Sequence, residues 1–267
     1  MRTLIWTATI VFLCWGAAVV ALFLFRHSLI YPFRDWPRAD QVAGVPGAVA
    51  ETVAAPDGVP IIAWVVSPRQ GRPTILYFGG NAGSLPSVAP RLEEFALHGF
   101  GIVAMNYRGS GGAAGKPSQK ALISDALAVY DAQFPDMPPV IYGTSLGAAL
   151  AVQVAAEREA AALVLETPFA RLCETAQYHY PIVPVCLLLP DERWESFRAI
   201  GAVDAPLLIL HGDADRVIPL AHGRKLFDAA PEPKQMIVYP GGDHNDLRLY
   251  GAGADTIRFL EGLAKGE

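Results

Sequence analysis

The sequence predicts an α/β fold, in which a mainly parallel sheet of about eight strands is covered by helices on both faces. Short apolar runs alternate along the chain with amphipathic segments of helical period, and this order requires a parallel sheet. The apolar runs are nearly continuous, as strands buried on both faces should be. A further observation sets the first residues apart, because no charged residue occurs from Thr3 to Phe25.

The strands and helices follow from these patterns in chain order. The apolar runs predict strands at 73–80, 101–107, 139–143, 161–167, 205–212 and 235–241. The amphipathic segments predict helices at 88–99, 119–134 and 219–230. Before them, 48–55 and 59–68 are joined through Pro56-Asp57-Gly58, which predicts an antiparallel hairpin at one edge of the sheet.

The uncharged stretch predicts an uncleaved transmembrane anchor over residues 1–28. As a helix, Thr3 to Phe25 would measure about 35 Å against a hydrocarbon core of about 30 Å. A signal peptide would have a shorter apolar centre and a small-residue cleavage site, whereas "ALFLFRHSLIYPF" stays bulky and apolar. A buried core helix of this length would show a polar face. We expect a connector at 29–49 and a catalytic domain at 50–267.

The charges and cysteines leave the compartment open. Three arginines follow the span (Arg26, Arg34 and Arg38) and Arg2 precedes it, so the count favours a cytoplasmic domain by a small margin. Cys173 and Cys186 are expected to be two buried free thiols, with a disulfide between them as the alternative. The net charge of −5, without long charged runs, disfavours nucleic acid as a partner.

One short motif carries most of the chemistry. Gly143-Thr144-Ser145-Leu146-Gly147 follows an apolar run and precedes an alanine-rich helical segment. In a parallel sheet the carboxyl ends of the strands gather the reactive groups, and this pentapeptide fits the strand-to-helix elbow that exposes a nucleophilic serine. A serine in an ordinary tight turn is the alternative. The strand before it and the helix after it favour the nucleophile.

A nucleophilic serine requires a histidine base, and the histidine requires an acid that fixes its tautomer. His244 follows a predicted strand, whereas His222 lies in a helical pattern where we expect solvent exposure. His211 ends a strand and is expected to hydrogen-bond the loop. Three acids also follow strands, namely Glu166, Asp213 and Asp215, and the residues alone do not choose among them.

The chain resembles the α/β-hydrolase superfamily, which often carries H-G-x-x-D-x-[VI]-[VI]-P after its seventh strand. "HGDADRVIP" matches that pattern and implies that Asp215 is the triad acid, that Asp213 shapes the loop and that Glu166 is a supporting carboxylate. "HSLIYPF", "YFGGNAGS", "NYRGSGGAAGKPS", "TPFARLCETAQYHYPIVPV" and "GGDHND" are similar to single-span bud-emergence-type hydrolases, relatives of serine aminopeptidase-like and depalmitoylating enzymes.

The same resemblance implies the remaining parts of the site. The backbone N–H groups of Asn81 and Leu146 are expected to form the oxyanion hole, although Gly79 stands where the family has a histidine. Asn106 replaces an expected aspartate, and Arg108 is expected to have a structural role. The segment at about 168–206 resembles a short lid between the sixth and seventh strands.

Three classes of function remain open at this stage. The first is a membrane-anchored serine hydrolase that cleaves carboxylic esters or thioesters of a small or lipid-like acyl substrate. The second is a serine aminopeptidase on the same triad, for which Glu166 or Glu174 would have to bind a substrate amine. The third is a membrane-anchored interaction protein without catalysis. The chemistry implies neither a cofactor nor a metal, and the sequence does not fix the oligomeric state.

Overall fold

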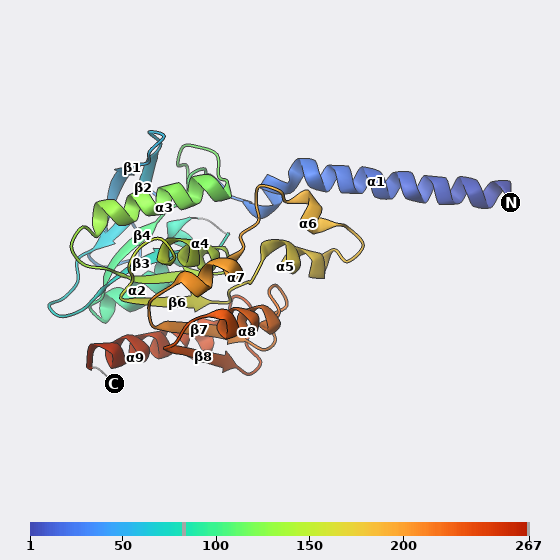
Figure 1. Cartoon of the computed structure of the whole chain (residues 1–267). Helices are drawn as coiled ribbons and strands as arrows, with labels where there is room; N and C mark the ends of the chain where they lie inside the picture. Colours follow the sequence, from blue (N-terminus) through green and yellow to red (C-terminus); the bar gives the residue numbers. More distant parts are fainter. Residues whose placement is uncertain (82–83, 266–267) are drawn as a thin grey trace.

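The chain forms a sheet of eight strands with helices on both sides, as the computed structural model shows for residues 1–81 and 84–265 (Figure 1). The strand order is β1-β2-β4-β3-β5-β6-β7-β8. β1 and β2 are antiparallel to their neighbours, and β4, β3, β5, β6, β7 and β8 pair in parallel. The predicted fold class, with its edge hairpin, is therefore confirmed.

The elements have the following bounds. The strands are β1 (Val49–Ala54), β2 (Pro60–Val66), β3 (Thr74–Phe78), β4 (Gly101–Met105), β5 (Val140–Thr144), β6 (Ala162–Glu166), β7 (Leu207–Gly212) and β8 (Lys234–Tyr239). The α-helices are α1 (Arg2–Ile30), α2 (Leu85–Leu97), α3 (Gln119–Gln133), α4 (Leu146–Ala155), α5 (Leu172–His179), α6 (Val185–Leu188), α7 (Ser196–Ala199), α8 (Leu220–Ala229) and α9 (Ala252–Lys265). Two short 3-10 helices are η1 (Ile200–Ala202) and η2 (Leu247–Tyr250).

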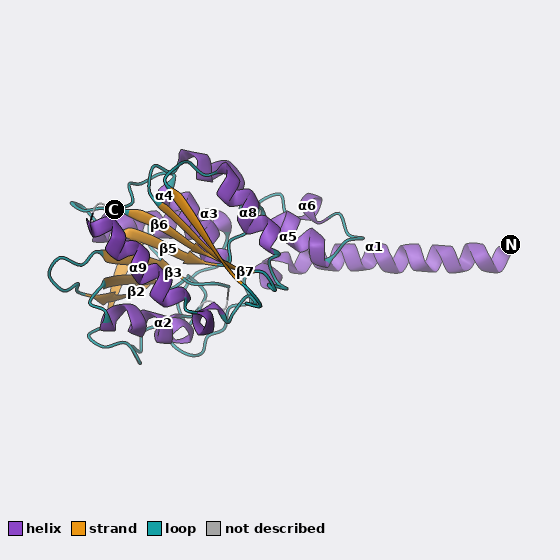
Figure 2. Ribbon diagram, turned by 90° about the horizontal axis from the view of Figure 1, so that it is seen from below, coloured by secondary structure: helices purple, strands orange, loops and turns teal. Residues whose placement is uncertain are grey.

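The helices divide between the two faces of the sheet, and each face has its own core. α3, α4 and α8 cover one face with buried side chains such as Leu122 and Leu226. α2 and α9 cover the other with Leu92, Phe95 and Leu260. Figure 2 shows this layering with the sheet between the two groups of helices. Strands such as β6, in which every residue is buried, explain the continuous apolar runs in the sequence.

A cap of short helices lies between β6 and β7, in the segment where a lid was expected. It consists of α5, α6 and α7, and its first two helices fold back on each other. This return brings the Cα atoms of Cys173 and Cys186 to 4.8 Å, and the two residues form a disulfide. The prediction of two buried free thiols is therefore wrong, because sequence spacing does not show that α5 and α6 form a hairpin. Cys186 is in fact exposed.

α1 extends away from the domain as a single long helix, beside the cap (Figure 1). It is long and apolar enough to cross a membrane, with a mean hydropathy of 2.5 in its most apolar window. It continues to Ile30, two residues beyond the predicted limit of the anchor. The segment between α1 and β1 lacks regular structure but packs on the domain, because the indole N–H of Trp64 donates to the carbonyl of Ala39 over 2.7 Å.

Candidate active site

Ser145 lies in a strained turn between β5 and α4. Its backbone has φ 54° and ψ −116°, a region that residues with a side chain rarely adopt. The turn is fixed on the strand side, where the N–H of Ser145 donates to the carbonyl of Glu166 over 2.9 Å. The elbow expected from the pentapeptide is thus present, and it holds the serine at the carboxyl end of β5.

The two glycines of the pentapeptide are required by close backbone packing. A Cβ atom on Gly143 would lie 2.2 Å from the carbonyl oxygen of Gly147, and one on Gly147 would lie 2.1 Å from that of Phe78. No side chain can be accommodated at either distance. The glycines therefore let α4 begin directly against the ends of β3 and β5, and this contact fixes the position of Ser145.

His244 connects Ser145 to Asp215. The Nε2 atom of His244 is 3.0 Å from the hydroxyl of Ser145, and its Nδ1 atom is 2.8 Å from Oδ2 of Asp215. The serine follows β5, the aspartate follows β7 and the histidine follows β8. Parallel pairing of β5 through β8 brings these three strand ends to one edge of the sheet, which is why residues far apart in sequence meet.

The surroundings of Asp215 keep its carboxylate ionised and oriented. Its Oδ1 atom accepts hydrogen bonds from the backbone N–H groups of Val217 (2.8 Å) and Ile218 (2.7 Å), so Oδ2 is left to face His244. Burial by itself would raise the pKa of Asp215, but hydrogen bonds with His211 and His244 outweigh it, and the pKa lies well below its usual range. Asp215 is therefore a charged acceptor at neutral pH.

The two other acids have different partners. Asp213 accepts a hydrogen bond from the backbone N–H of Gly241 over 2.7 Å, and it joins the loops that follow β7 and β8. Glu166 is buried and forms a bidentate ion pair with Arg91, while the hydroxyl of Tyr142 also donates to it. Both residues thus take the supporting positions that the sequence analysis expects, and neither hydrogen-bonds His244 in the described residues.

The neighbouring histidines differ in their surroundings. His211 is fully buried, and its Nε2 atom lies 2.9 Å from the carbonyl of Ile218, the loop contact that was expected. His222 lies on α8 and is half-buried, so the expectation of solvent exposure is wrong. Burial lowers the pKa of His222, because its ring packs against the domain.

The candidate oxyanion donors lie beside the serine. Leu146 is the first residue of α4, and its N–H has no intrahelical acceptor because it belongs to the first turn. Asn81 borders the same cavity as Ser145 and Leu146, and Gly80 packs directly against the serine. The hydroxyl of Tyr107 donates to the carbonyl of Gly79. This hydrogen bond supports the loop at the position where the family has a histidine.

The contacts of Asn106 and Arg108 explain two further features of the sequence, the replacement of an expected aspartate by Asn106 and the structural role expected for Arg108. The amide of Asn106 donates to the carbonyls of Tyr107 and Ser110, so it shapes the turn after β4. Arg108 pairs with Asp57 and with the buried Asp125. The structural role expected for Arg108 is confirmed, because its guanidinium joins the β1–β2 turn to α3.

One supporting residue escaped the sequence analysis. Asp243, immediately before the histidine, accepts hydrogen bonds from the backbone N–H groups of Arg216 (3.0 Å) and His244 (2.8 Å) and pairs with the Arg216 side chain. These bonds with Arg216 and His244 lower the pKa of Asp243 to about 2. Asp243 therefore ties the loop of the acid to the loop of the histidine. Its place beside His244 in "GGDHND" was the only signal.

A cavity of about 260 Å³ adjoins Ser145 and is lined mainly by apolar side chains. Its walls come from the cap, from the loop after β7 and from α1. Phe169, Leu172, Val183 and Leu189 are among the apolar cap residues that line it. Arg26 is the only charged residue among the described residues of this lining. Such a cavity accommodates an apolar group next to the serine hydroxyl.

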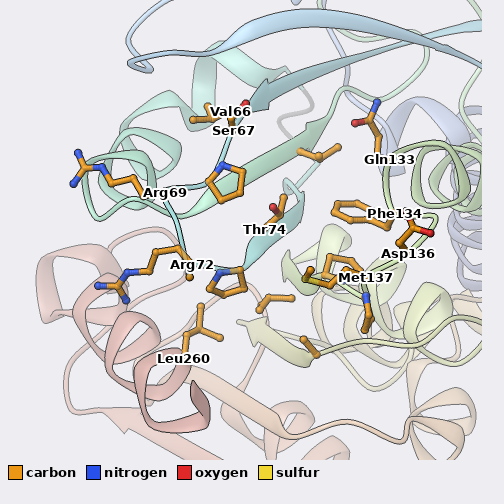
Figure 3. A pocket seen from close by; sticks show the side chains of 18 of the residues that line it. Val66, Ser67, Arg69, Arg72, Thr74, Gln133, Phe134, Asp136, Met137 and Leu260 are labelled. Carbon is orange, nitrogen blue, oxygen red and sulfur yellow. The ribbon is translucent and has the colours of Figure 1, made fainter. Parts of the chain in front are cut away.

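A larger cavity of about 880 Å³ lies at the opposite end of the sheet (Figure 3). It is bordered by the amino end of β3 at Thr74, by the loop from Gln133 to Val140, and by Arg69 and Arg72. None of the triad candidates reaches it, since all of them follow strand carboxyl ends. Elsewhere, the part of the chain that the structure describes contains no group of three His, Cys, Asp or Glu side chains arranged to hold a metal.

The eight-strand sheet with a serine elbow after β5 defines an α/β hydrolase. The family model described as serine aminopeptidase, S33, matches residues 70–201 and 192–248, which is more than half of the chain. The chain therefore belongs to this hydrolase family, within the α/β-hydrolase superfamily. The resemblance noted in the sequence is confirmed at this level.

Similar proteins span nearly the whole chain. An uncharacterised protein of Mycobacterium tuberculosis is 36% identical over 87% of this chain and 86% of its own length. An uncharacterised membrane protein of Saccharomyces cerevisiae is 28% identical over 90% of each chain. Among solved structures, the Pyrococcus furiosus esterase Pf2001 superposes with a TM-score of 0.68 at 17% identity, covering 86% of this chain and 97% of that one. This last similarity concerns the fold.

Proposed function

We propose that the protein is a membrane-anchored serine hydrolase that cleaves carboxylic esters or thioesters through an acyl-enzyme intermediate. The observation that carries this proposal is the continuous chain of hydrogen bonds from Ser145 through His244 to Asp215, at a strained elbow beside an apolar cavity. Nucleophile, base and acid lie within hydrogen-bond reach of one another, which is the geometry that acyl transfer requires.

The proposed reaction has two halves. His244 takes the proton of the Ser145 hydroxyl as its oxygen attacks the substrate carbonyl carbon, and the N–H groups of Leu146 and Asn81 stabilise the resulting oxyanion. The intermediate collapses when the leaving alcohol or thiol takes the proton from His244, and the acyl group stays on the serine. A water molecule then loses a proton to His244 as its oxygen attacks the acyl carbonyl carbon. The bond between the acyl carbon and Ser145 breaks, the serine oxygen takes the proton back from His244, and the carboxylic acid is released. Asp215 holds the histidine in the correct tautomer throughout.

An acyl substrate is favoured over a peptide with a free amino terminus. An aminopeptidase needs a carboxylate that binds the substrate ammonium group, and no Asp or Glu belongs to the described lining of the cavity. Of the two acids considered for that task, Glu166 is paired with Arg91, and Glu174 is paired with Lys225 at 2.9 Å. The described lining of the cavity therefore offers no carboxylate for the amino-terminal recognition that the family's name describes.

We also propose that α1 anchors the enzyme and that the catalytic domain faces an oxidising compartment. The arginine count favours the cytoplasm by a small margin, but the disulfide between Cys173 and Cys186 favours the other side, because cytosolic thiols are kept reduced. The disulfide carries more weight, because the arginine count favours the cytoplasm by only a small margin.

Labelling with a fluorophosphonate tests the serine. We expect the full-length enzyme to be labelled and to hydrolyse p-nitrophenyl butyrate, and Ser145→Ala to abolish labelling and lower turnover by about a thousandfold or more. Ser110→Ala is the matched control, because Ser110 is buried in the turn after β4. Unchanged turnover in Ser145→Ala would end the proposal. Faster cleavage of aminoacyl anilides than of esters would instead favour the peptidase.

A further inference from the structure

α1 has one face that packs against protein, although the helix is apolar all round. Six residues of α1 are partly buried, and five of them recur at intervals of three or four, which places them on a single face of the helix: Gly16, Val19, Leu22, Arg26 and Ile30. The sixth, His27, lies beside Arg26 and faces the buried Glu192. Most other residues of α1 are exposed, including Val20 and Leu24. Only this one face is therefore withheld from the surrounding lipid.

The partner of this face is the cap. Val183, Val185 and Leu189 form a small apolar cluster with Val19 and Leu22 of α1 packed against it. Further from the domain, the indole N–H of Trp15 donates to the carbonyl of Ile182 over 3.1 Å. The cap thus follows α1 for about half of its length and ends beside Trp15, which Figure 1 shows as the cap lying along the helix.

Polar contacts fix α1 at its carboxyl end. Arg26 pairs with Asp191 at 3.1 Å. Tyr31, directly after the helix, donates to the buried carboxylate of Glu192, which also accepts from the backbone N–H of Gln119 at 3.0 Å. The helix is therefore joined to both the cap and α3, and its direction relative to the domain is set.

The cavity at Ser145 uses α1 as a wall. Leu22, Arg26, Leu29 and Ile30 of α1 line it together with cap residues. Leu22 lies eight residues before the end of the helix, about 12 Å along its axis. The apolar cavity thus extends from the serine along α1, away from the sheet.

The length of the uncharged stretch determines how deep in the bilayer the cavity-lining part of α1 would lie. A span of about 20 residues is needed to cross the hydrocarbon core. Every such span within residues 3–25 contains both Trp15 and Leu22. The tip of the cap beside Trp15 is then inside the hydrocarbon core, and its exposed side chains are suited to lipid: Tyr178 (62% exposed), Ile182 (76%) and Leu187 (79%).

We propose that the cavity receives its substrate from the bilayer, between α1 and the cap, and that the substrate is a membrane-resident single-chain acyl ester or thioester. The inference rests on the proposed function of Ser145. The acyl chain passes from the leaflet into an apolar cavity beside Leu22 without crossing water. The volume of about 260 Å³ is too small for two acyl chains side by side, and it would enclose the part of one chain nearest the serine.

The test compares two probes on the full-length enzyme in phosphatidylcholine vesicles: p-nitrophenyl acetate in the water and p-nitrophenyl palmitate in the same vesicles. Leu22→Trp fills the cavity beside α1 and should lower the ratio of palmitate turnover to acetate turnover at least tenfold. Val20→Trp, two residues away on the exposed face, should change neither rate. Unchanged palmitate turnover in Leu22→Trp would overturn the inference.

A second variant covers the case in which Leu22→Trp disturbs the whole domain and lowers both rates equally. Leu22→Ala enlarges the cavity, so the preferred chain in a series from butyrate to palmitate should become longer by two or more carbons. An unshifted chain-length profile would overturn the inference. Failure of the proposed function is distinguishable, because it would appear as acetate turnover that Ser145→Ala does not change.

Discussion

Asp215 is distinguished from the neighbouring acids by what each carboxylate accepts. Oδ1 of Asp215 is occupied by two backbone N–H groups, and Oδ2 is directed at His244. Asp213 and Glu166 are equally close to strand ends, but they accept from Gly241 and from Arg91. The role of each acid therefore depends on which hydrogen-bond donors the fold places beside its carboxylate.

Substitution of the acids should show this ranking. We expect Asp215→Asn to lower kcat by about 10⁴-fold, because the amide no longer fixes the tautomer of His244. Asp213→Asn is the matched control and should lower kcat by less than tenfold. Steady-state kinetics with a p-nitrophenyl ester measure both. If Glu166→Gln were the most damaging of the three substitutions, the triad acid would be Glu166, at the end of β6, and not Asp215.

Gly143 allows a test of the elbow through stability. Because a Cβ atom there would lie 2.2 Å from backbone, we expect Gly143→Ala to destabilise the fold by about 3 kcal/mol or more. Gly262→Ala is the control, since a Cβ atom on this α9 glycine meets nothing within 4 Å. That substitution should stabilise by up to about 1 kcal/mol. Thermal unfolding in detergent compares the two, and equal Tm values would contradict the packing argument.

The cap, at the scale of the element, is a short helical hairpin held by one covalent bond. α5 and α6 are too short to be stable on their own, and each exposes a large apolar side chain, Tyr178 and Leu187 respectively. The disulfide between Cys173 and Cys186 restricts the open forms of this hairpin. It thereby keeps the cap in place as one wall of the cavity.

Removal of the disulfide should loosen the cap and lower the stability of the protein. We expect the Cys173→Ser/Cys186→Ser double variant to lose about 3 kcal/mol, the chain-entropy value for a closed loop of roughly this length. Reductant should lower the Tm of the wild type to that of the double variant. Cys14→Ser should change nothing, since Cys14 is a free thiol on α1.

The compartment is read from the same cysteines in intact cells. A thiol reagent that cannot cross membranes should label Cys173 and Cys186 only after a similarly impermeant reductant has been added. Labelling of both residues in lysed cells without any reductant would show free thiols, and it would return the domain to the cytoplasmic side that the arginine count favours.

The whole molecule combines a hydrolase domain with a helix that is long and apolar enough to span a membrane and that also packs against the cap; we propose that this helix is the anchor. Full-length protein should therefore sediment with membranes and resist a carbonate wash. Val11→Arg/Leu13→Arg should release it, because each arginine near the middle of a span costs about 2.5–3.5 kcal/mol. Ser28→Arg, outside the uncharged stretch, is the control and should stay in the membrane fraction. Sedimentation of the double arginine variant with membranes would contradict the anchor.

The sequence was sufficient for the sheet and for the meeting of Ser145 and His244, because each residue follows an apolar run and parallel strands align their ends. Three acids follow strands in the same way, and only the resemblance to the α/β-hydrolase superfamily singled out Asp215. It was insufficient where contacts depend on tertiary packing. Uniform hydropathy hides the face of α1 that carries Leu22, since apolar residues satisfy lipid and protein alike. Likewise, Glu192 in the cap gives no sign that it will meet Tyr31, because a lone acid has no periodic pattern.

With α1 in the bilayer and the cavity open to it, as proposed, the fixed junction between α1 and the domain would make bilayer thickness a variable of catalysis. A transmembrane helix adapts to a thinner membrane by tilting. Here Arg26 and Tyr31 join the helix to the cap and the domain, so a tilt of α1 turns the whole enzyme with it. The angle and depth at which the cavity meets the leaflet then change together. The same chain would sample different lipid depths, and so different acyl bonds, in membranes of different thickness.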